Sequence, residues 1–248
     1  MQFGLKLGSN DYNYTEDIFY FYNNGYFQYI ELFAVPQSFN NTIDYWKQFS
    51  IPFIIHAPHS FAGMNLSLPQ DRQKNKIMLQ ETFKFSDSLK ADYVIFHSGV
   101  NGNIEETINQ LNPYIDSRCL IENKPMKGLN GEKCLGSTPE ELTFIINELK
   151  TGFCLDFGHA ICTANSLRKN PFDYFKDFLA FEPKLYHLTD GDYKSEKDTH
   201  FHYGKGSFPL KELFKLIPEN AKVTNEAKHE SDISLNDFRD DYFYVKNI

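Results

Sequence analysis

GFCLDFGHA, the stretch Gly152–Ala160, decides how this chain is expected to fold. A short apolar run, Phe153–Leu155, is followed at once by Asp156 and, three residues later, by His159. A carboxylate that closes an apolar strand is costly to bury unless a cation or a hydrogen-bond donor lies beside it. The stretch therefore predicts a buried strand whose carboxyl end carries functional polar groups.

Five further apolar runs end in the same way. They are FIIHAPH with His56, YVIFHSG with His97, CLIENKP with Glu122, LYHLTD with His187 and VTNEAK with Glu226. One such run alone more often ends in a hydrogen-bonded structural residue. Six of them in order indicate strand ends that converge on one site.

These runs alternate with helical patterns along the whole chain. We expect strands at Phe3–Gly8, Tyr29–Phe33, Phe53–His56, Tyr93–His97, Cys119–Glu122, Gly152–Asp156, Lys184–Leu188 and Lys222–Glu226. We expect helices from about Thr15, at Thr42–Phe49, Gln70–Leu89 and Ile104–Leu111, after a cap at Thr138, at Pro171–Leu179 and Leu210–Leu216, and from Ser234 onward.

Eight strands that alternate with helices over 248 residues predict an α/β fold, a single (β/α)8 TIM barrel over residues 1–248. In such barrels the active site lies on the loops after the carboxyl ends of the strands, where every candidate residue above is found. An open doubly wound sheet is the alternative. No Gly-rich phosphate fingerprint follows the first strand to support it.

Composition limits the classes of function. A chain with 41% hydrophobic residues can bury a large core, and its four cysteines lack CxxC spacing, so we expect them to be small buried hydrophobes. The net charge of −8 weakens a nucleic-acid hypothesis without excluding it, because bound divalent cations would reverse the sign locally. Without a signal-peptide pattern or a membrane-spanning run, a cytoplasmic protein with no membrane contact is expected.

The loop after the seventh strand, TDGDYKSEKDTHFHYGKGSF, adds two more candidates, Asp198 and His200. Together with the strand ends it gives nine potential metal ligands: His56, His97, Glu122, Asp156, His159, His187, Asp198, His200 and Glu226. One ion accepts about four to six ligands, so this set predicts two or three ions with a bridging carboxylate. Closely spaced divalent cations suit displacement at phosphorus.

The order HAPH, FHSG, LIEN, LDFGHA, YHLTD, DTHFHYGKG and NEAK resembles the endonuclease IV group within the xylose-isomerase-like TIM barrels, over roughly Phe53–Lys228. The resemblance implies a trinuclear zinc cluster, with Mn²⁺ or Fe as alternatives, that hydrolyses the phosphodiester 5′ to an abasic site in DNA repair. It implies one ion on His56, His97 and Glu122, a second on Glu122, Asp156, His187 and Glu226, and a third on His159, Asp198 and His200. The catalytic residues it implies are Glu122, Glu226 and His159.

Sugar isomerases and epimerases of the same superfamily are the alternative. They resemble this chain at Glu122, Asp156, His187 and Glu226, where one Mn²⁺ or Mg²⁺-like ion would bind and the two glutamates would flank a sugar as acid and base. Isomerase-type members usually carry an arginine before the GxG of the seventh loop, so Asp198 and His200 favour the hydrolase. The expected partner is DNA with abasic sites, or else a small sugar or sugar phosphate; the oligomeric state stays open.

Several residues depart from the nuclease pattern. Lys6, His59 and Thr189 stand where that group has His, Tyr and Asn, and the loop AVPQSF lacks the group's arginine segment. Glu31 is expected to face the barrel interior or to pair with Lys6. The apolar candidates for wedging into a duplex are Phe33, Phe39 and Phe61, and the lysines expected near the cleft are Lys6, Lys124, Lys127, Lys133, Lys194, Lys197 and Lys205.

Overall fold

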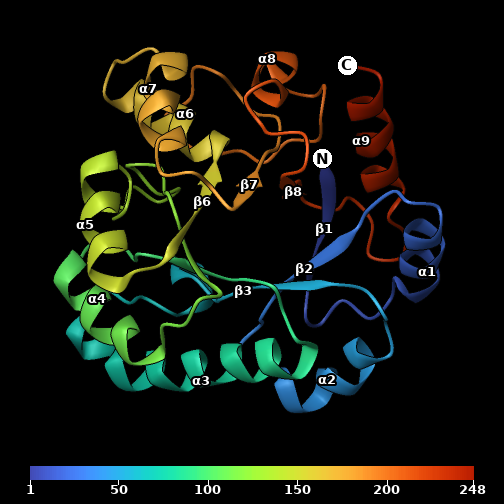
Figure 1. The fold of residues 1–248 in the computed structure, drawn as a ribbon, viewed down its shortest axis with the longest axis horizontal. Helices are drawn as coiled ribbons and strands as arrows, with labels where there is room; N and C mark the ends of the chain where they lie inside the picture. The colour runs from blue at the N-terminus through green and yellow to red at the C-terminus, as the bar shows by residue number, and fades with distance from the viewer.

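The computed structural model describes residues 1–248 and contains a closed barrel of eight parallel strands in sequence order (Figure 1). This is the predicted (β/α)8 TIM barrel. The strands are β1 (Gln2–Gly8), β2 (Tyr29–Phe33), β3 (Phe53–His56), β4 (Val94–His97), β5 (Cys119–Glu122), β6 (Gly152–Asp156), β7 (Leu185–His187) and β8 (Lys222–Asn225).

The helices surround the barrel, and the C-terminal helix lies beside the first strands (Figure 1). The α-helices are α1 (Thr15–Asn23), α2 (Phe39–Lys47), α3 (Arg72–Leu89), α4 (Ile104–Leu111), α5 (Pro139–Leu149), α6 (Phe157–Ser166), α7 (Pro171–Leu179), α8 (Leu210–Phe214) and α9 (Asn236–Lys246). Three short 3₁₀ turns are η1 (Ser60–Ala62), η2 (Pro69–Asp71) and η3 (Asn112–Tyr114). No helix has both the length and the apolar content needed to cross a bilayer.

The barrel interior has an apolar layer below a polar one. Tyr29, Ile54, Ile95, Leu120, Cys154 and Leu185 form one buried cluster inside the strands. Successive side chains of a strand point to opposite faces, so the residue two positions later returns to the same face. That residue is Glu31, His56, His97, Glu122, Asp156 or His187, which explains why the polar groups gather at the carboxyl ends of the strands.

Tyr29 fills the lower end of the barrel because its neighbour is a glycine. A Cβ on Gly4 would lie 2.3 Å from the Tyr29 ring, and the Tyr29 hydroxyl is 2.9 Å from the Thr224 hydroxyl. A second, larger cluster of 51 buried residues packs the helices against the outside of the barrel. The cysteines are all free and buried, as expected.

Helix α2 begins at Phe39, three residues before the predicted start at Thr42. The reason is a contact from α3, because the Glu81 carboxylate accepts hydrogen bonds from the backbone N–H groups of Gln37 (2.7 Å) and Phe39 (2.8 Å). These N–H groups precede or open the helix, and a distant side chain satisfies them in place of a local cap. A contact this far away in sequence leaves no local signal.

Helix α6 was not predicted, since no element was assigned between the sixth strand and the helix at Pro171–Leu179. Asp156 caps this helix by accepting a hydrogen bond from the backbone N–H of His159 at 2.7 Å. Every residue from Phe157 to Ala164 is buried. A helix that is buried on all sides has no polar face, so its sequence lacks the period of an amphipathic helix.

Candidate metal centre

A cleft of about 450 Å³ opens at the carboxyl ends of the strands. Seven of the nine candidate ligands line it, namely His56, His97, Glu122, His159, Asp198, His200 and Glu226. The other two, Asp156 and His187, are buried at the ends of β6 and β7. The structure therefore gathers all nine at one end of the barrel, in three groups whose donor atoms lie within 4.8 Å of one another.

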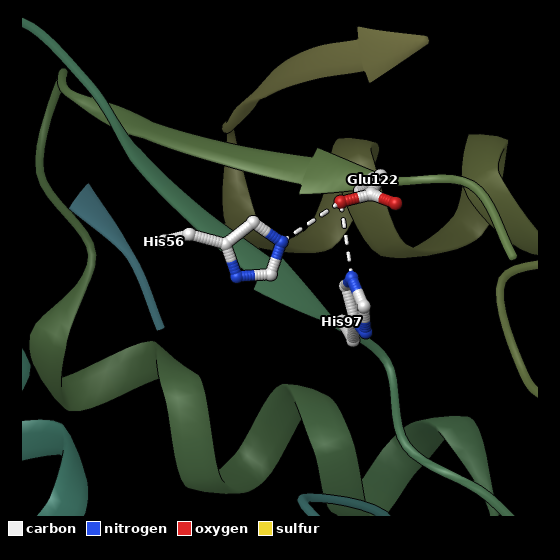
Figure 2. Close-up of side chains that lie close together, drawn as sticks. All are labelled: His56, His97 and Glu122. Carbon is white, nitrogen blue, oxygen red and sulfur yellow. Dashed lines mark hydrogen bonds and ion pairs between the residues drawn. The ribbon is translucent and has the colours of Figure 1, made fainter. Parts of the chain in front are cut away.

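The first group consists of His56, His97 and Glu122, at the ends of β3, β4 and β5. Both imidazoles point at the same carboxylate oxygen (Figure 2), with Glu122 Oε2 3.1 Å from His56 Nε2 and 3.0 Å from His97 Nε2. All three side chains come from rigid strands. Their arrangement is therefore set by the barrel rather than by a loop.

The second group consists of Glu122, Asp156, His187 and Glu226, so it shares Glu122 with the first. His187 Nδ1 lies 3.0 Å from Glu226 Oε1 and 3.5 Å from Glu122 Oε2, yet it is a buried atom without a hydrogen-bond partner. An unsatisfied buried nitrogen facing two carboxylates is costly on its own. It is the arrangement expected where a cation completes the site.

The third group consists of His159 in the first turn of α6 and of Asp198 and His200 in the loop after β7. His159 Nε2 lies 3.3 Å from Asp198 Oδ2, and His200 forms an ion pair with the same oxygen. Asp190 anchors this loop, because its carboxylate accepts hydrogen bonds from the backbone N–H groups of Gly191, Gly204, Gly206 and Phe208 at 2.8–3.0 Å.

Hydrogen bonds outside the groups decide which ring nitrogen faces inward. Nδ1 of His56, His159 and His200 lies 2.8, 2.8 and 3.1 Å from a backbone carbonyl, which can only accept, so Nδ1 carries a proton. The free lone pair on Nε2 then faces a carboxylate oxygen. Only a proton or a cation between the two makes that contact favourable, so the donor set fits a divalent-metal centre.

With protein groups alone, protons take that place on two of these rings. Burial is the largest single influence and would lower both pKa values, but Asp156, Asp198 and Glu122 together outweigh it and raise the pKa of His159 to about 10. Asp198 likewise raises the pKa of His200 to about 9. For Asp156 burial dominates, because it disfavours the charged carboxylate and raises the pKa to about 6.

Glu31 and Lys6 support the second group from β2 and β1. Buried Glu31 accepts hydrogen bonds from His187 Nε2 (2.9 Å) and the Thr224 hydroxyl (2.7 Å), and it lies 3.0 Å from Lys6 Nζ. Both expectations for Glu31 therefore hold, since it faces the interior and pairs with Lys6. By donating its Nε2 proton to Glu31, His187 presents Nδ1 to the site.

Asn123 is a site residue that the sequence interpretation missed. Its side-chain amide joins the backbone N–H and carbonyl of Asp156, at 2.8 Å each, and its own carbonyl accepts from His159 Nδ1. It thus orients two ligands from β6 and α6. The only signal available was its place directly after Glu122.

The rim of the cleft differs in part from expectation. Phe33 and Phe61 line it, but Phe39 was wrongly expected there, because it opens α2 and packs against Phe85. Among the lysines, Lys6, Lys124 and Lys127 line the cleft as predicted, and Lys228 was missed. The other four expected lysines do not belong to its lining: Lys133, Lys194, Lys197 and Lys205.

Comparison with known proteins agrees with this architecture. The family model for the xylose isomerase-like TIM barrel matches residues 27–231. A protein named probable endonuclease 4, from Sulfurihydrogenibium sp. (strain YO3AOP1), is 30% identical over 186 residues, which are 64% of this chain and 63% of that protein. The match therefore spans less than two thirds of that relative's length.

Two solved structures share the fold at 18% identity. A D-tagatose 3-epimerase-like protein superposes with a TM-score of 0.71, covering 100% of this chain and 96% of that one. Endonuclease IV from Thermus thermophilus superposes with a TM-score of 0.68, covering 100% of both chains. One barrel thus accommodates two different chemistries, so function has to be argued from the site.

Proposed function

The chain belongs to the xylose isomerase-like TIM barrel family. Within this family, we propose that it is a divalent-metal-dependent phosphodiester hydrolase of the endonuclease IV type. Its proposed substrate is DNA that carries an abasic site. The name of the relative at 30% identity agrees with this proposal.

The observation that carries the proposal is the third donor group. A single-ion enzyme would need only Glu122, Asp156, His187 and Glu226, which form a complete group by themselves. The third group adds three donors and shares no member with that set. Additional ions are what a displacement at phosphorus uses to stabilise both the entering and the leaving oxygen.

We propose two or three ions, Zn²⁺ first and Mn²⁺ or Fe as alternatives, held by the nine residues of the three groups. Ions held there would supply a nucleophile near neutral pH and stabilise the charge that develops on the phosphoryl oxygens. Glu122 would belong to both the first and the second group, and its shared carboxylate would fix the position of one group relative to the other. His159 and Glu226 would orient the phosphate from two different elements, His159 from α6 and Glu226 from the end of β8.

A sugar isomerase or epimerase is the second candidate, supported by the completeness of the four-residue group. Glu122 and Glu226 both lie at the ends of strands and both line the cleft, so they could serve as acid and base on either side of a sugar. This candidate leaves the third group without a purpose. The hydrolase is therefore preferred.

Incision of a duplex with one abasic site, set against epimerisation of ketoses and aldoses, tests the choice with Zn²⁺ and with Mn²⁺. We expect incision, and we expect His200→Ala to abolish it. Lys205→Ala is the control, because Lys205 lies exposed on the same loop and outside the cleft lining. Sugar turnover that survives His200→Ala, without incision, would reject the hydrolase.

A further inference from the structure

Two lysine side chains reach into the donor groups. Lys6 Nζ forms an ion pair with Glu226 Oε1 and lies 3.0 Å from Glu31 Oε1. Its side chain is only 20% exposed. The ammonium therefore neutralises one carboxylate of the second group from within the barrel.

Lys124 contacts the third group in a different way. Its Nζ lies 3.3 Å from His159 Nε2, while His159 Nδ1 donates to the Asn123 carbonyl. The same Nε2 lies 3.3 Å from Asp198 Oδ2. Lys124 forms no ion pair with a carboxylate. The positive charge of its ammonium group is therefore not neutralised by a partner and acts on the third group.

No lysine contacts the first group directly, although Lys124 is close enough to add to burial in lowering the pKa of His97. His56 and His97 both contact Glu122 through Nε2, and no lysine lies within hydrogen-bonding distance of any of the three side chains. The three groups thus have similar donor atoms but differ in whether a lysine ammonium group contacts them. A metal ion that enters the third group has to displace Lys124 from His159, whereas one that enters the first displaces no lysine.

We propose that Lys6 and Lys124 make the three donor groups unequal, so that the first group binds a divalent ion tightly and the other two bind their ions weakly and reversibly. An ammonium and a divalent ion repel strongly at a separation of about 4 Å in a partly buried site. Metal occupancy of the second and third groups then depends on the free ion concentration. The inference rests on the proposed metal centre but not on the proposed substrate.

Titration of the chelator-treated full chain with Zn²⁺, in competition with a chromophoric chelator, tests this without an activity assay. We expect the wild type to bind one ion at least about tenfold more tightly than the others. Lys124→Met should tighten a weak site at least about tenfold and change the affinity of the tight site by less. Tighter binding in a variant cannot result from a damaged fold.

Two controls isolate the charge of Lys124. Lys124→Arg keeps the cation and should bind like the wild type, and so should Lys205→Met, which removes an exposed lysine from outside the cleft lining. Equal affinity of all ions in the wild type, or no tightening in Lys124→Met, would overturn the inference. A wild type that binds no ion would overturn the metal centre itself.

Discussion

Glu122 is the residue on which the donor groups converge. Its Oε2 faces His56 at 3.1 Å, His97 at 3.0 Å and His187 at 3.5 Å, and its Oε1 lies 3.1 Å from His159 Nδ1. Burial opposes its ionisation, but the surrounding histidines, His97 first, hold the pKa of Glu122 well below its usual range. One buried negative charge is therefore shared by four imidazoles.

Glu122→Gln keeps the size of this side chain and removes the shared charge. We expect metal affinity and hydrolysis to fall by at least about 100-fold, because outer contacts to metal ligands alone account for 10- to 100-fold. The circular dichroism spectrum should not change. Glu105→Gln, an exposed change on α4, is the control. Near-full activity in Glu122→Gln would show that the donor groups are misassigned.

At the scale of elements, helix α9 stabilises two segments that carry site residues. It lies beyond residue 231, where the match to the family model ends. Buried Asp241 accepts from Tyr203 N (2.8 Å), His202 Nδ1 (2.7 Å) and Asn225 Nδ2 (2.6 Å). Tyr203 follows His200 by three residues, and Asn225 directly precedes Glu226. One carboxylate thus joins the seventh loop to the end of β8.

Asp241→Asn should lower the free energy of unfolding by about 2–4 kcal/mol, because the amide nitrogen cannot accept the bonds from His202 and Asn225. Metal bound per chain should fall as well, since the segments that carry His200 and Glu226 lose their brace. Urea unfolding and elemental analysis measure the two effects. The neighbouring Asp240→Asn is the matched control, because Asp240 is exposed and pairs only with Arg239. Equal stability of both variants would contradict the bracing role.

His229 attaches the start of the same C-terminal segment to β1, and this contact predicts a pH dependence of stability. Its ring nitrogens lie 3.1 Å from Asp237 Oδ1 and 3.1 Å from the Lys6 carbonyl, so both donate and the ring is cationic. Burial opposes that charge most strongly, but the hydrogen bond and negative charge of Asp237 together with the Lys6 carbonyl outweigh it and raise the pKa of His229 above 6.5. Burial likewise opposes ionisation of Asp237, yet His229 lowers its pKa below 3.8.

A raised histidine pKa stabilises the fold fully below the unfolded value of 6.5 and no longer does so once the pH passes the folded pKa. The lowered pKa of Asp237 stabilises the fold above 3.8 and loses its effect as the pH falls through the folded value. The His229–Asp237 ion pair therefore stabilises the fold most between pH 3.8 and pH 6.5. Between pH 6 and pH 9 the free energy of unfolding should therefore fall less in His229→Gln than in the wild type, by on the order of 1 kcal/mol. Parallel stability curves for variant and wild type would disprove this.

The sequence predicted most of these elements because their signals are local. Apolar runs that end in His, Asp or Glu mark β3 to β7, and the Thr138 cap marks the start of α5, where its hydroxyl accepts from Glu141 N. Helix α6 escaped because total burial removes the amphipathic period, and the start of α2 escaped because Glu81 caps it from α3. What was missed is what tertiary contacts determine.

At the scale of the whole molecule, the same distinction between local sequence signals and tertiary contacts applies to the site. The three donor groups could be anticipated, because strand ends of a closed barrel must meet and a resemblance named the partners. The contacts of Asn123, Lys124 and Asp241 could not, because each depends on which side chain a neighbouring element brings within about 3 Å. Sequence patterns place residues on elements and do not give such distances.

The charge distribution of the whole molecule bears on the proposed DNA substrate. The chain carries a net charge of −8, and four lysines line its cleft. Lys6 is paired with Glu226 and Lys127 with Glu196, which leaves Lys124 and Lys228 without a carboxylate in ion-pair distance. Few phosphates can therefore be neutralised by the protein surface.

This predicts a shallow salt dependence. Each neutralised phosphate contributes a slope of about −0.9 to a plot of log affinity against log salt, so two lysines and the scissile phosphate at the metal centre predict a slope between about −2 and −3. Lys228→Met should make the slope shallower by about 1, whereas Lys205→Met should not change it. Fluorescence anisotropy with an abasic duplex measures both. A slope steeper than about −5 would require a basic surface outside the cleft, and a slope near zero would mean that DNA phosphates are not what the cleft binds.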